Sequence, residues 1–324
     1  MKYFFSPYDL PSFNLALEEH LFQQYNDDVF LIYINRPSVI IGKHQIPSKE
    51  CDVMNAMKHE IEVYRRFTGG GTVFHDAGNV NFSFVKKSTS NTINIDFKEF
   101  INPVAEYLQS LSLQVTINKR NNILIEDRKV SGNAQHISKN KTVHHGTLLF
   151  NSDLHLLKDI INTNQSEYED KSVKSVSSDT TNISNHLTTE MTVNEFAKGL
   201  TRYIVKKFDC ELLNIDNEML QEIHHLEQNK YKNLQWTYGY SPDYILHKNT
   251  QIKEHPHIFS LHVKNGIISD IRIQEDPQKF ISFMFTHLKG KLHSPLNVLQ
   301  YTEEFIKEFK EFNSYKNLLS RIFF

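Results

Sequence analysis

Cysteine is scarce in this 324-residue chain, and neither sign of charge dominates it. The two cysteines, Cys51 and Cys210, lie far apart and offer neither a metal-ligand spacing nor a disulfide framework. Lys and Arg total 36 against 38 for Asp and Glu, which gives a formal net charge of −2. No overall basic field therefore favours nucleic acid or an anionic membrane as a partner.

Long apolar runs are also missing. The N-terminal MKYFFSPYDL has one lysine and three aromatic residues before a proline, far short of the apolar region of a signal peptide. No stretch approaches the roughly 20 apolar residues that a membrane helix needs. We therefore expect a soluble cytoplasmic protein that contacts neither membrane nor nucleic acid.

The length allows two domains, and the N-terminal pattern mixes helix and strand. Ser12 is predicted to cap a helix with apolar residues at helical spacing. Strands are predicted at 29–35, 38–44, 61–67, 80–84, 113–118, 122–126, 129–137 and 142–151, and an amphipathic helix at 97–111.

The composition changes between residues 162 and 190, where Asn, Ser, Thr, Lys and Asp predict a long loop or linker. Beyond it, helical spacing recurs near 192–208, 216–228, 277–288 and 297–321, and strands are predicted near 258–274. The pattern predicts an α+β protein with a mixed α/β domain at residues 1–245 and a smaller α/β domain at 246–324.

The stretch RRFTGGGTVFHDAGNVNFSF, residues 65–84, is the first candidate for a ligand site. Three consecutive glycines allow backbone N–H groups to converge on an anion without steric hindrance. Arg65 and Arg66 alternate faces of a strand, so one of them can offer its guanidinium to a phosphate. Taken alone, the stretch fits an ordinary glycine-rich turn equally well, and it lacks the spacing of the common nucleotide motifs.

Two later stretches favour a ligand site. KRNNILIEDRKVSGNAQ, residues 119–135, places Lys129 at the start of a strand that continues into small and polar residues. HHGTLLFN, residues 144–151, puts His-Gly-Thr before an apolar run. In this order the three stretches resemble the lipoate-protein ligase family, whose pattern is RRxSGGGxVxHDxGNxNxS, RND, K[IV]SGxA and HHGTLL. The resemblance spans about residues 36–185, and WTYGYSPDY at 236–244 extends it.

The resemblance implies a biotin-ligase-like mixed β-sheet catalytic domain with flanking helices and a small accessory C-terminal domain. It also implies an enzyme that uses ATP and Mg²⁺ to convert lipoate to lipoyl-AMP and pyrophosphate. The lipoyl group would then pass to a lysine of an acceptor domain, in the glycine-cleavage H protein or a 2-oxoacid dehydrogenase E2. We expect a monomer that needs no protein nucleophile, because the mixed anhydride is already activated.

Site residues follow from the resemblance position by position. Lys129 is the implied catalytic residue, whose ammonium would stabilise charge on the carboxylate and the α-phosphate by roughly 3 kcal/mol or more. The implied nucleotide-binding residues are Arg66, Gly71, Thr72, Val73, Phe74, Asn121, Asn122 and Lys129. The implied lipoyl-side residues are Gly69, Gly70, His75, Asn133, His145, Gly146 and Thr147.

The chain departs from the family pattern at three positions that concern ATP use. Asn122 stands where an aspartate is usual, so it would be a weak Mg²⁺ ligand acting through the phosphates, because Mg²⁺ prefers anionic oxygen. Ser177 and Asp179 stand where arginines are common.

Three other functions compete with the ligase. A transferase that takes preformed lipoyl-AMP or a lipoylated carrier remains open because of these departures. Lys129 argues against a non-catalytic lipoyl-domain-binding protein, which would have little use for an ammonium at the reacting carboxylate. Biotin ligase is disfavoured because no GRGRxGR-type loop is present.

Three further residues are expected to have structural roles. His144 and His145 face opposite sides of a strand and cannot chelate one metal, and we expect His144 at the surface. Asp76 should bond nearby backbone amides. Cys51 invites comparison with related transferases that form thioesters on cysteine, but a buried free thiol is the expectation.

Overall fold

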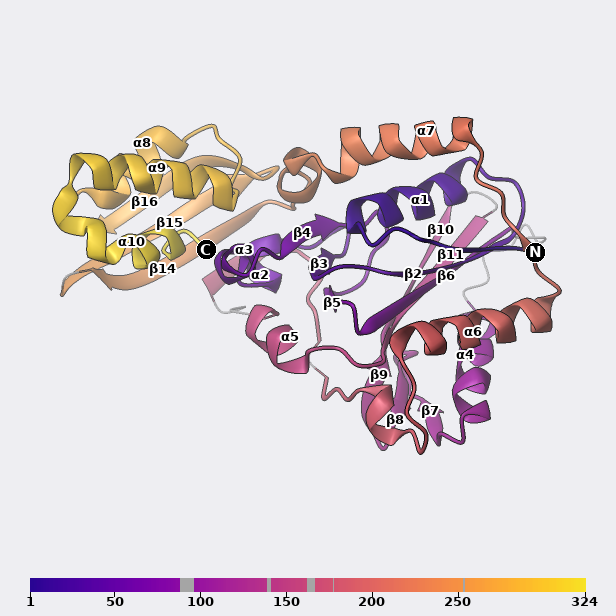
Figure 1. Cartoon of the computed structure of the whole chain (residues 1–324). Coiled ribbons are helices and arrows are strands. Elements are labelled where there is room, and N and C mark those ends of the chain that lie inside the picture. The colour runs from indigo at the N-terminus through magenta and orange to yellow at the C-terminus, as the bar shows by residue number, and fades with distance from the viewer. Residues whose placement is uncertain (88–95, 139–140, 162–166, 177, 253) are drawn as a thin grey trace.

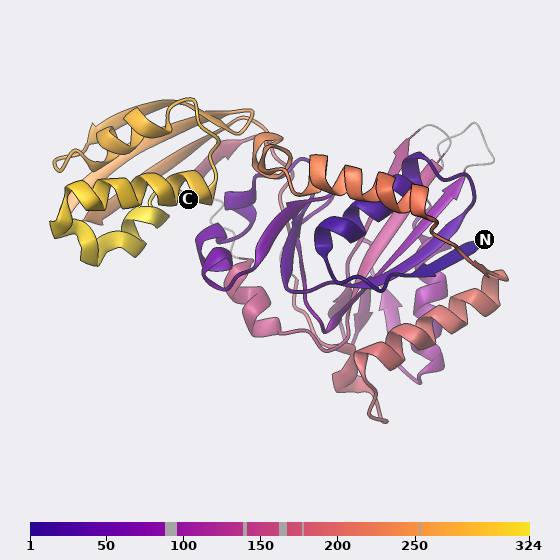
Figure 2. The same cartoon turned by 45° about the horizontal axis from the view of Figure 1, so that its top comes forward.

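The computed structural model describes the chain except residues 88–95, 139–140, 162–166, 177 and 253. The molecule is elongated (Figures 1 and 2). Its N-terminal part is large, and the opposite end of the molecule consists of a C-terminal sheet covered by helices. None of the helices in the described ranges is long and apolar enough to cross a membrane.

A mixed six-stranded sheet forms the centre of the N-terminal part. Its order is β10 (Asn133–Ser138), β11 (Lys141–Leu149), β6 (Asn79–Lys87), β2 (Val29–Ile34), β1 (Lys2–Phe5) and β13 (Glu211–Leu212). β6 runs antiparallel to both β11 and β2, whereas β1 pairs in parallel with β2 and β13.

Helices cover both faces of this sheet (Figure 1). Phe30 and Ile32 of β2 pack in a core with α4 (Lys98–Ser110) and α6 (Val193–Phe208). Leu31 of the same strand packs on the other face, in a core with α1 (Pro11–Gln23) and α7 (Asn217–Leu226). Since both faces are buried, the strand is apolar throughout rather than alternating.

Two three-stranded sheets flank the central one, and together with β10 and β11 of the central sheet they carry residues of the candidate site. The first has the order β4 (Glu62–Arg65), β3 (Ser38–Ile41) and β5 (Val73–His75). The second has the order β7 (Val115–Ile117), β8 (Ile123–Ile125) and β9 (Arg128–Ser131). Three short helices pack beside them: α2 (Pro47–Glu50), α3 (Val53–Lys58) and α5 (Leu154–Ile160).

The C-terminal sheet has the order β12 (Tyr168–Asp170), β14 (Tyr244–Ile252), β15 (His255–Lys264) and β16 (Ile267–Glu275). A core that includes Phe280, Phe305 and Phe312 joins it to α8 (Phe280–Leu288), α9 (Pro295–Glu308), η5 (Lys310–Tyr315) and α10 (Lys316–Arg321). Its edge strand β12 lies in the stretch predicted to be a loop. The prediction missed this strand because three residues are too few to show alternation. The proposed division at residue 245 stays a prediction.

The predicted helices lie close to the observed ones, but the residue that caps a helix is not always the predicted one. α6 begins after a capping box formed by Thr192 and Glu195, and α7 begins after Asp216, which accepts the N–H of Met219. The predicted Ser12 cap is wrong. α1 begins at Pro11 without a side-chain cap, and the Ser12 hydroxyl instead donates to buried Glu227 at 2.7 Å.

Two π-helical turns, η3 (Glu227–Tyr231) and η4 (Gln235–Gly239), follow α7. A 3₁₀ turn, η2 (Ile183–His186), precedes α6. The chain after α7 then runs into β14 and the C-terminal sheet (Figure 1).

Candidate active site

A cavity of about 210 Å³ lies between the glycine loop, strands β9 to β11 and residues 174–176 and 178. Most of the predicted site residues meet in its wall: Arg66, Gly71, Thr72, Val73, His75, Asn122, Lys129, Asn133, His145, Gly146 and Thr147. The fold thus brings together residues from the three motifs that are far apart in the sequence. Their roles in binding and catalysis stay predictions.

The remaining predicted residues lie just outside the wall: Gly69, Gly70, Phe74 and Asn121. Phe74 alternates on β5 with Val73 and His75, so its side chain points into the core instead. Asn121 has a φ of 61° in the turn between β7 and β8, and its carbonyl accepts the Asn133 side-chain amide at 2.8 Å.

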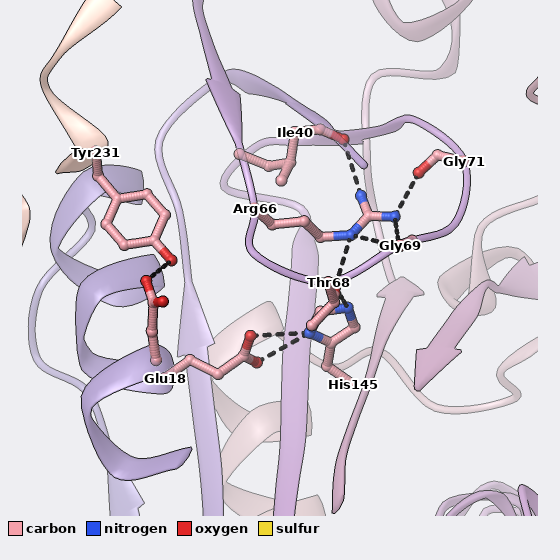
Figure 3. A network of polar contacts seen from close by, with 9 residues as sticks. Glu18, Ile40, Arg66, Thr68, Gly69, Gly71, His145 and Tyr231 are labelled. Atoms are coloured by element: carbon pink, nitrogen blue, oxygen red, sulfur yellow. Dashed lines mark hydrogen bonds and ion pairs between the residues drawn. The ribbon is translucent and has the colours of Figure 1, made fainter. Parts of the chain in front are cut away.

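The glycine loop wraps around the guanidinium of Arg66 (Figure 3). Arg66 Nη2 donates to the carbonyls of Gly69 at 2.6 Å and Gly71 at 2.7 Å, and Nη1 donates to the Ile40 carbonyl at 3.2 Å. Gly70 holds the left-handed φ of 92° that the loop requires. In this structure Arg66 therefore braces the loop, while its predicted contact with phosphate remains a prediction.

A glycine outside the motif also shapes this loop. A Cβ on Gly42 would stand 2.1 Å from the Gly70 carbonyl oxygen, so only glycine permits this close approach. Sequence reasoning missed Gly42 because a single glycine at the end of a strand carries no motif.

Arg65 faces away from the cavity, as the alternation of the strand predicts. It is fully buried and donates to the carbonyls of Lys43 at 2.8 Å, Gln45 at 2.7 Å and Thr237 at 2.6 Å, among others. Burial lowers the pKa of Arg65 to about 10, which leaves it charged at neutral pH. The residue therefore ties β4 to η4.

His145 is held between a carboxylate and a hydroxyl. Its Nδ1 lies 2.9 and 3.0 Å from the two carboxylate oxygens of Glu18, and its Nε2 lies 3.0 Å from Thr68 Oγ (Figure 3). Arg66 Nε donates to the same Thr68 oxygen at 3.1 Å, which leaves the hydroxyl hydrogen free to donate to Nε2. This arrangement places a proton on Nδ1 of His145, where it bonds Glu18.

Glu18 is a site residue that sequence reasoning missed. It is fully buried on α1, remote in sequence from every motif. A glutamate among helical residues is typical of a solvated face, so only the packing of α1 against β11 could identify it.

Replacing Glu18 by Gln should weaken binding of the lipoate that the family resemblance implies as substrate. The amide keeps the shape but removes the charge from the bond that orients His145, so we expect KM for lipoate to rise about tenfold, with KM for ATP little changed. Steady-state kinetics with each substrate varied will measure this. The matched control is Glu19→Gln, since buried Glu19 bonds Tyr231 at 2.7 Å and Lys230 at 2.6 Å rather than His145. Equal changes in both KM values would contradict the assignment.

Two neighbouring histidines, His75 and His144, are buried, and burial lowers the pKa of each to about 3. Asn35 Nδ2 donates to His75 Nδ1 at 2.9 Å. The expected surface position of His144 is wrong, because its ring is fully buried and stacks on Phe100 at 5.0 Å between centroids. The reason is that Phe97 and Phe100, at the start of α4, pack on the face of β11 that carries His144, so its ring contacts them rather than solvent.

Lys129 extends along the cavity from β9. A Cβ on Gly132 would lie 2.9 Å from its Nζ, so glycine makes room for the ammonium. Burial, and then the charge of Arg120, lower the pKa of Lys129. Its backbone N–H donates to the Asp179 carbonyl at 2.8 Å, and its carbonyl accepts the Thr181 N–H at 3.1 Å.

Of the departures from the family pattern, Asn122 lines the cavity, whereas the Asp179 side chain is exposed. Ser177 lies outside the described residues. The cavity wall contains no carboxylate, and among the described residues no group of three or more His, Cys, Asp or Glu could hold a metal ion. These donors fit Mg²⁺ only weakly, through an amide oxygen such as that of Asn122 and through phosphates on the ligand itself.

A second loop, which contains Lys174, Ser175 and Val176, lines the cavity beside the glycine loop. Ser175 Oγ accepts the N–H of Thr72 at 2.9 Å and the side-chain amide of Gln45 at 3.0 Å. Further back, the buried Lys49 bonds Asp170 of β12, and it donates to Ser172 Oγ at 3.2 Å. The same short segment therefore joins the edge of the C-terminal sheet to the cavity wall.

Cys51 and Asp76 have the expected structural roles. Cys51 Sγ donates to the Pro47 carbonyl at 3.3 Å outside the cavity, and burial raises the pKa of its thiol. Asp76 accepts the backbone N–H of Gly78 at 2.9 Å and of Asp153 at 2.7 Å. Neither is placed to carry an acyl group or to act as a base.

Comparisons with known proteins agree with this geometry. Residues 10–205 match the family model for the lipoyl protein ligase A/B catalytic domain. The chain is 33% identical over 301 residues to lipoate–protein ligase 1 of Staphylococcus aureus, covering 92% of this chain and 91% of that protein. It is 35% identical over 273 residues to lipoate-protein ligase LplJ of Bacillus subtilis, covering 82% of each.

Solved structures give the same fold. A crystal structure of lipoate-protein ligase A bound with ATP superposes with a TM-score of 0.61 at 23% identity, covering 73% of this chain and 96% of that one. A bipartite lipoate protein ligase of Thermoplasma acidophilum, studied with its E2 lipoyl domain, gives 0.60 at 21% identity, covering 73% and 95%. This likeness confirms the predicted α+β ligase-like fold.

Proposed function

The chain belongs to the lipoyl protein ligase A/B catalytic-domain family, and on this premise we propose that it is an ATP-dependent lipoate–protein ligase. The observation that carries the proposal is the cavity, where Lys129, the braced glycine loop and His145 form one wall. That wall is cationic and free of carboxylates, so it suits a phosphate anhydride.

In the first half-reaction a lipoate carboxylate oxygen attacks the α-phosphorus of ATP. The bond from this phosphorus to the bridging oxygen breaks, and pyrophosphate leaves with the electron pair. The Lys129 ammonium would contact the carboxylate and the α-phosphate and stabilise the charge that develops there. Bound Mg²⁺ would neutralise phosphate charge, with Asn122 as its amide ligand.

In the second half-reaction the amine of an acceptor lysine attacks the carbonyl of lipoyl-AMP. The carbonyl–oxygen bond breaks, AMP leaves with that oxygen, and the nitrogen loses a proton to solvent. Leu15, Ile40, Val73 and Ala134 give the cavity an apolar side for the acyl chain. Ala134 pairs with His145 across β10 and β11, which supports the proposed lipoyl side of the site.

The proposed acceptor is a lipoyl domain, of the glycine-cleavage H protein or of a 2-oxoacid dehydrogenase E2. The pairing of a related ligase with its E2 lipoyl domain supports this class of partner. We propose that the enzyme acts as a cytoplasmic monomer.

The test is incubation of the purified chain with lipoate, Mg-ATP and apo-acceptor domains. Pyrophosphate release follows the first half-reaction, and the mass increase of the acceptor follows the second. A ligase gives both. A protein that gives neither, when it is folded and supplied with several acceptors, is not a lipoate–protein ligase.

The second candidate is a transferase that takes preformed lipoyl-AMP or a lipoylated carrier. Asn122 in the cavity wall is the observation that favours it, because a neutral amide attracts Mg²⁺ less than the usual aspartate does. Transfer from synthetic lipoyl-AMP, without pyrophosphate release from ATP, would support this function.

Replacing Asn122 by Asp separates the two functions. We expect the variant to form lipoyl-AMP at a lower Mg²⁺ concentration, roughly tenfold lower if the added charge contributes about 1.4 kcal/mol. Transfer from preformed lipoyl-AMP should stay nearly unchanged. If the Mg²⁺ dependence does not move, or both half-reactions slow alike, residue 122 has no part in metal binding.

A further inference from the structure

Four cationic side chains line the cavity, and they differ in exposure. Arg66 and Lys129 lie within it, whereas Arg120 and Lys174 are exposed at its rim. The wall holds no carboxylate to neutralise the outer pair. The roles assigned above engage the inner pair and leave Arg120 and Lys174 unexplained.

The two rim cations come from separate segments that the fold fixes in place. Arg120 lies in the turn between β7 and β8, where Asn118 Oδ1 accepts the N–H of Arg120 at 2.9 Å and of Asn122 at 3.1 Å. Lys174 lies between two residues that hydrogen-bond to the rest of the N-terminal part. Val173 donates its N–H to the His44 carbonyl at 3.3 Å, and Ser175 accepts the N–H of Thr72. Both backbones are therefore positioned before any ligand arrives.

Arg120 and Lys174 lie where the β- and γ-phosphates of ATP, which leave as pyrophosphate, would be bound. Because Lys129 lies within the cavity and the outer pair at its rim, a triphosphate whose α-phosphate contacts Lys129 can extend its β- and γ-phosphates toward Arg120 and Lys174. These two phosphates carry most of the negative charge, and after adenylation they depart together as pyrophosphate. Exposed cations attract such an anion but hold it weakly, because water and salt screen them, whereas buried cations would retain it.

We propose that Arg120 and Lys174 bind the β- and γ-phosphates of ATP and release them as pyrophosphate. The inference rests on the proposed ATP-dependent function. The bonds that form and break are those of the first half-reaction above, and the two residues act only on its leaving group. They are phosphate-binding residues of the adenylation step and have no part in transfer from lipoyl-AMP.

The test compares R120Q, K174Q and the double variant with two matched controls. The controls are K119Q and K171Q, which remove exposed lysines from the same two segments but not from the cavity wall. The double variant should raise KM for ATP about tenfold and each single variant about threefold, the sizes expected for exposed charges. It should also weaken inhibition by added inorganic pyrophosphate by a similar factor.

Ionic strength provides a readout that a purely structural role would not move. The wild-type KM for ATP should rise with salt, and the double variant should lose most of this dependence. Transfer from synthetic lipoyl-AMP should stay within about twofold of wild type. An unchanged KM for ATP and an unchanged pyrophosphate inhibition in the double variant would overturn the proposal.

Two other outcomes would point elsewhere. If the double variant keeps normal adenylation but needs more acceptor protein in the transfer assay, the rim cations bind an acidic acceptor surface and the proposal is wrong. If the wild-type protein transfers from lipoyl-AMP but releases no pyrophosphate from ATP, the ATP-dependent function fails, and the inference fails with it. The assays of the two half-reactions distinguish these results.

Discussion

The Lys129→Ala variant should lose at least about 100-fold in the rate of lipoyl-AMP formation. The ammonium is buried beside the space left by Gly132, where a fixed charge stabilises a developing anion far better than water does. A loss of roughly 3 kcal/mol of transition-state stabilisation corresponds to this factor. Single-turnover pyrophosphate release will measure it, and acceptor mass should show that transfer from lipoyl-AMP falls as well.

Two further measurements separate loss of the Lys129 charge from loss of the fold. Circular dichroism and a thermal melt should show a folded variant, because the side chain extends into a cavity rather than into the core. In the wild type, adenylation should decline as pH rises through the Lys129 pKa, at a pH below the usual 10.5, because burial and Arg120 disfavour the charged form. A folded Lys129→Ala protein with normal rates would overturn the mechanism.

The Arg65→Met variant should be strongly destabilised. Methionine fills part of the space, but it leaves buried carbonyls on Lys43, Gln45 and Thr237 without their charged donor. We expect the free energy of unfolding to fall by about 3 to 5 kcal/mol, because several carbonyls each lose a donor at about 1 to 3 kcal/mol apiece. Urea denaturation followed by fluorescence and by circular dichroism will measure the loss.

Arg36→Met is the matched control for that loss. Arg36 bonds Glu62 of the neighbouring strand at 2.6 Å, but both side chains are about half exposed. Its removal should cost no more than about 1 kcal/mol, as exposed pairs do. Equal losses of unfolding free energy in the two variants would show that the buried hydrogen bonds of Arg65 stabilise the fold no more than an exposed ion pair does.

Local patterns predicted much of the fold because they depend on neighbours in the chain. The spacing of apolar residues gave α4 and α6 nearly to the residue, and the alternation around residues 80–84 gave β6. The prediction failed where a local feature had a distant partner. Ser12 bonds Glu227 instead of capping its helix, and residues 168–170 form a strand only because β14 lies beside them.

The sequence by itself determined the chemistry that the site can offer. The order of the glycine loop, Lys129 and His145 was sufficient to name the family, because the motif residues and their spacing lie in contiguous stretches of the chain. Strand alternation also indicated that only one of Arg65 and Arg66 could face the ligand.

Only the tertiary structure decided what surrounds those groups. It placed Glu18 against His145, stacked His144 in the core and set Arg120 and Lys174 at the rim of one cavity. Burial, pKa and hydrogen-bond partners are fixed by residues that approach through space from other elements. Residue order does not show which distant residues come into contact. The partner of a buried charge can therefore be found only in the folded chain.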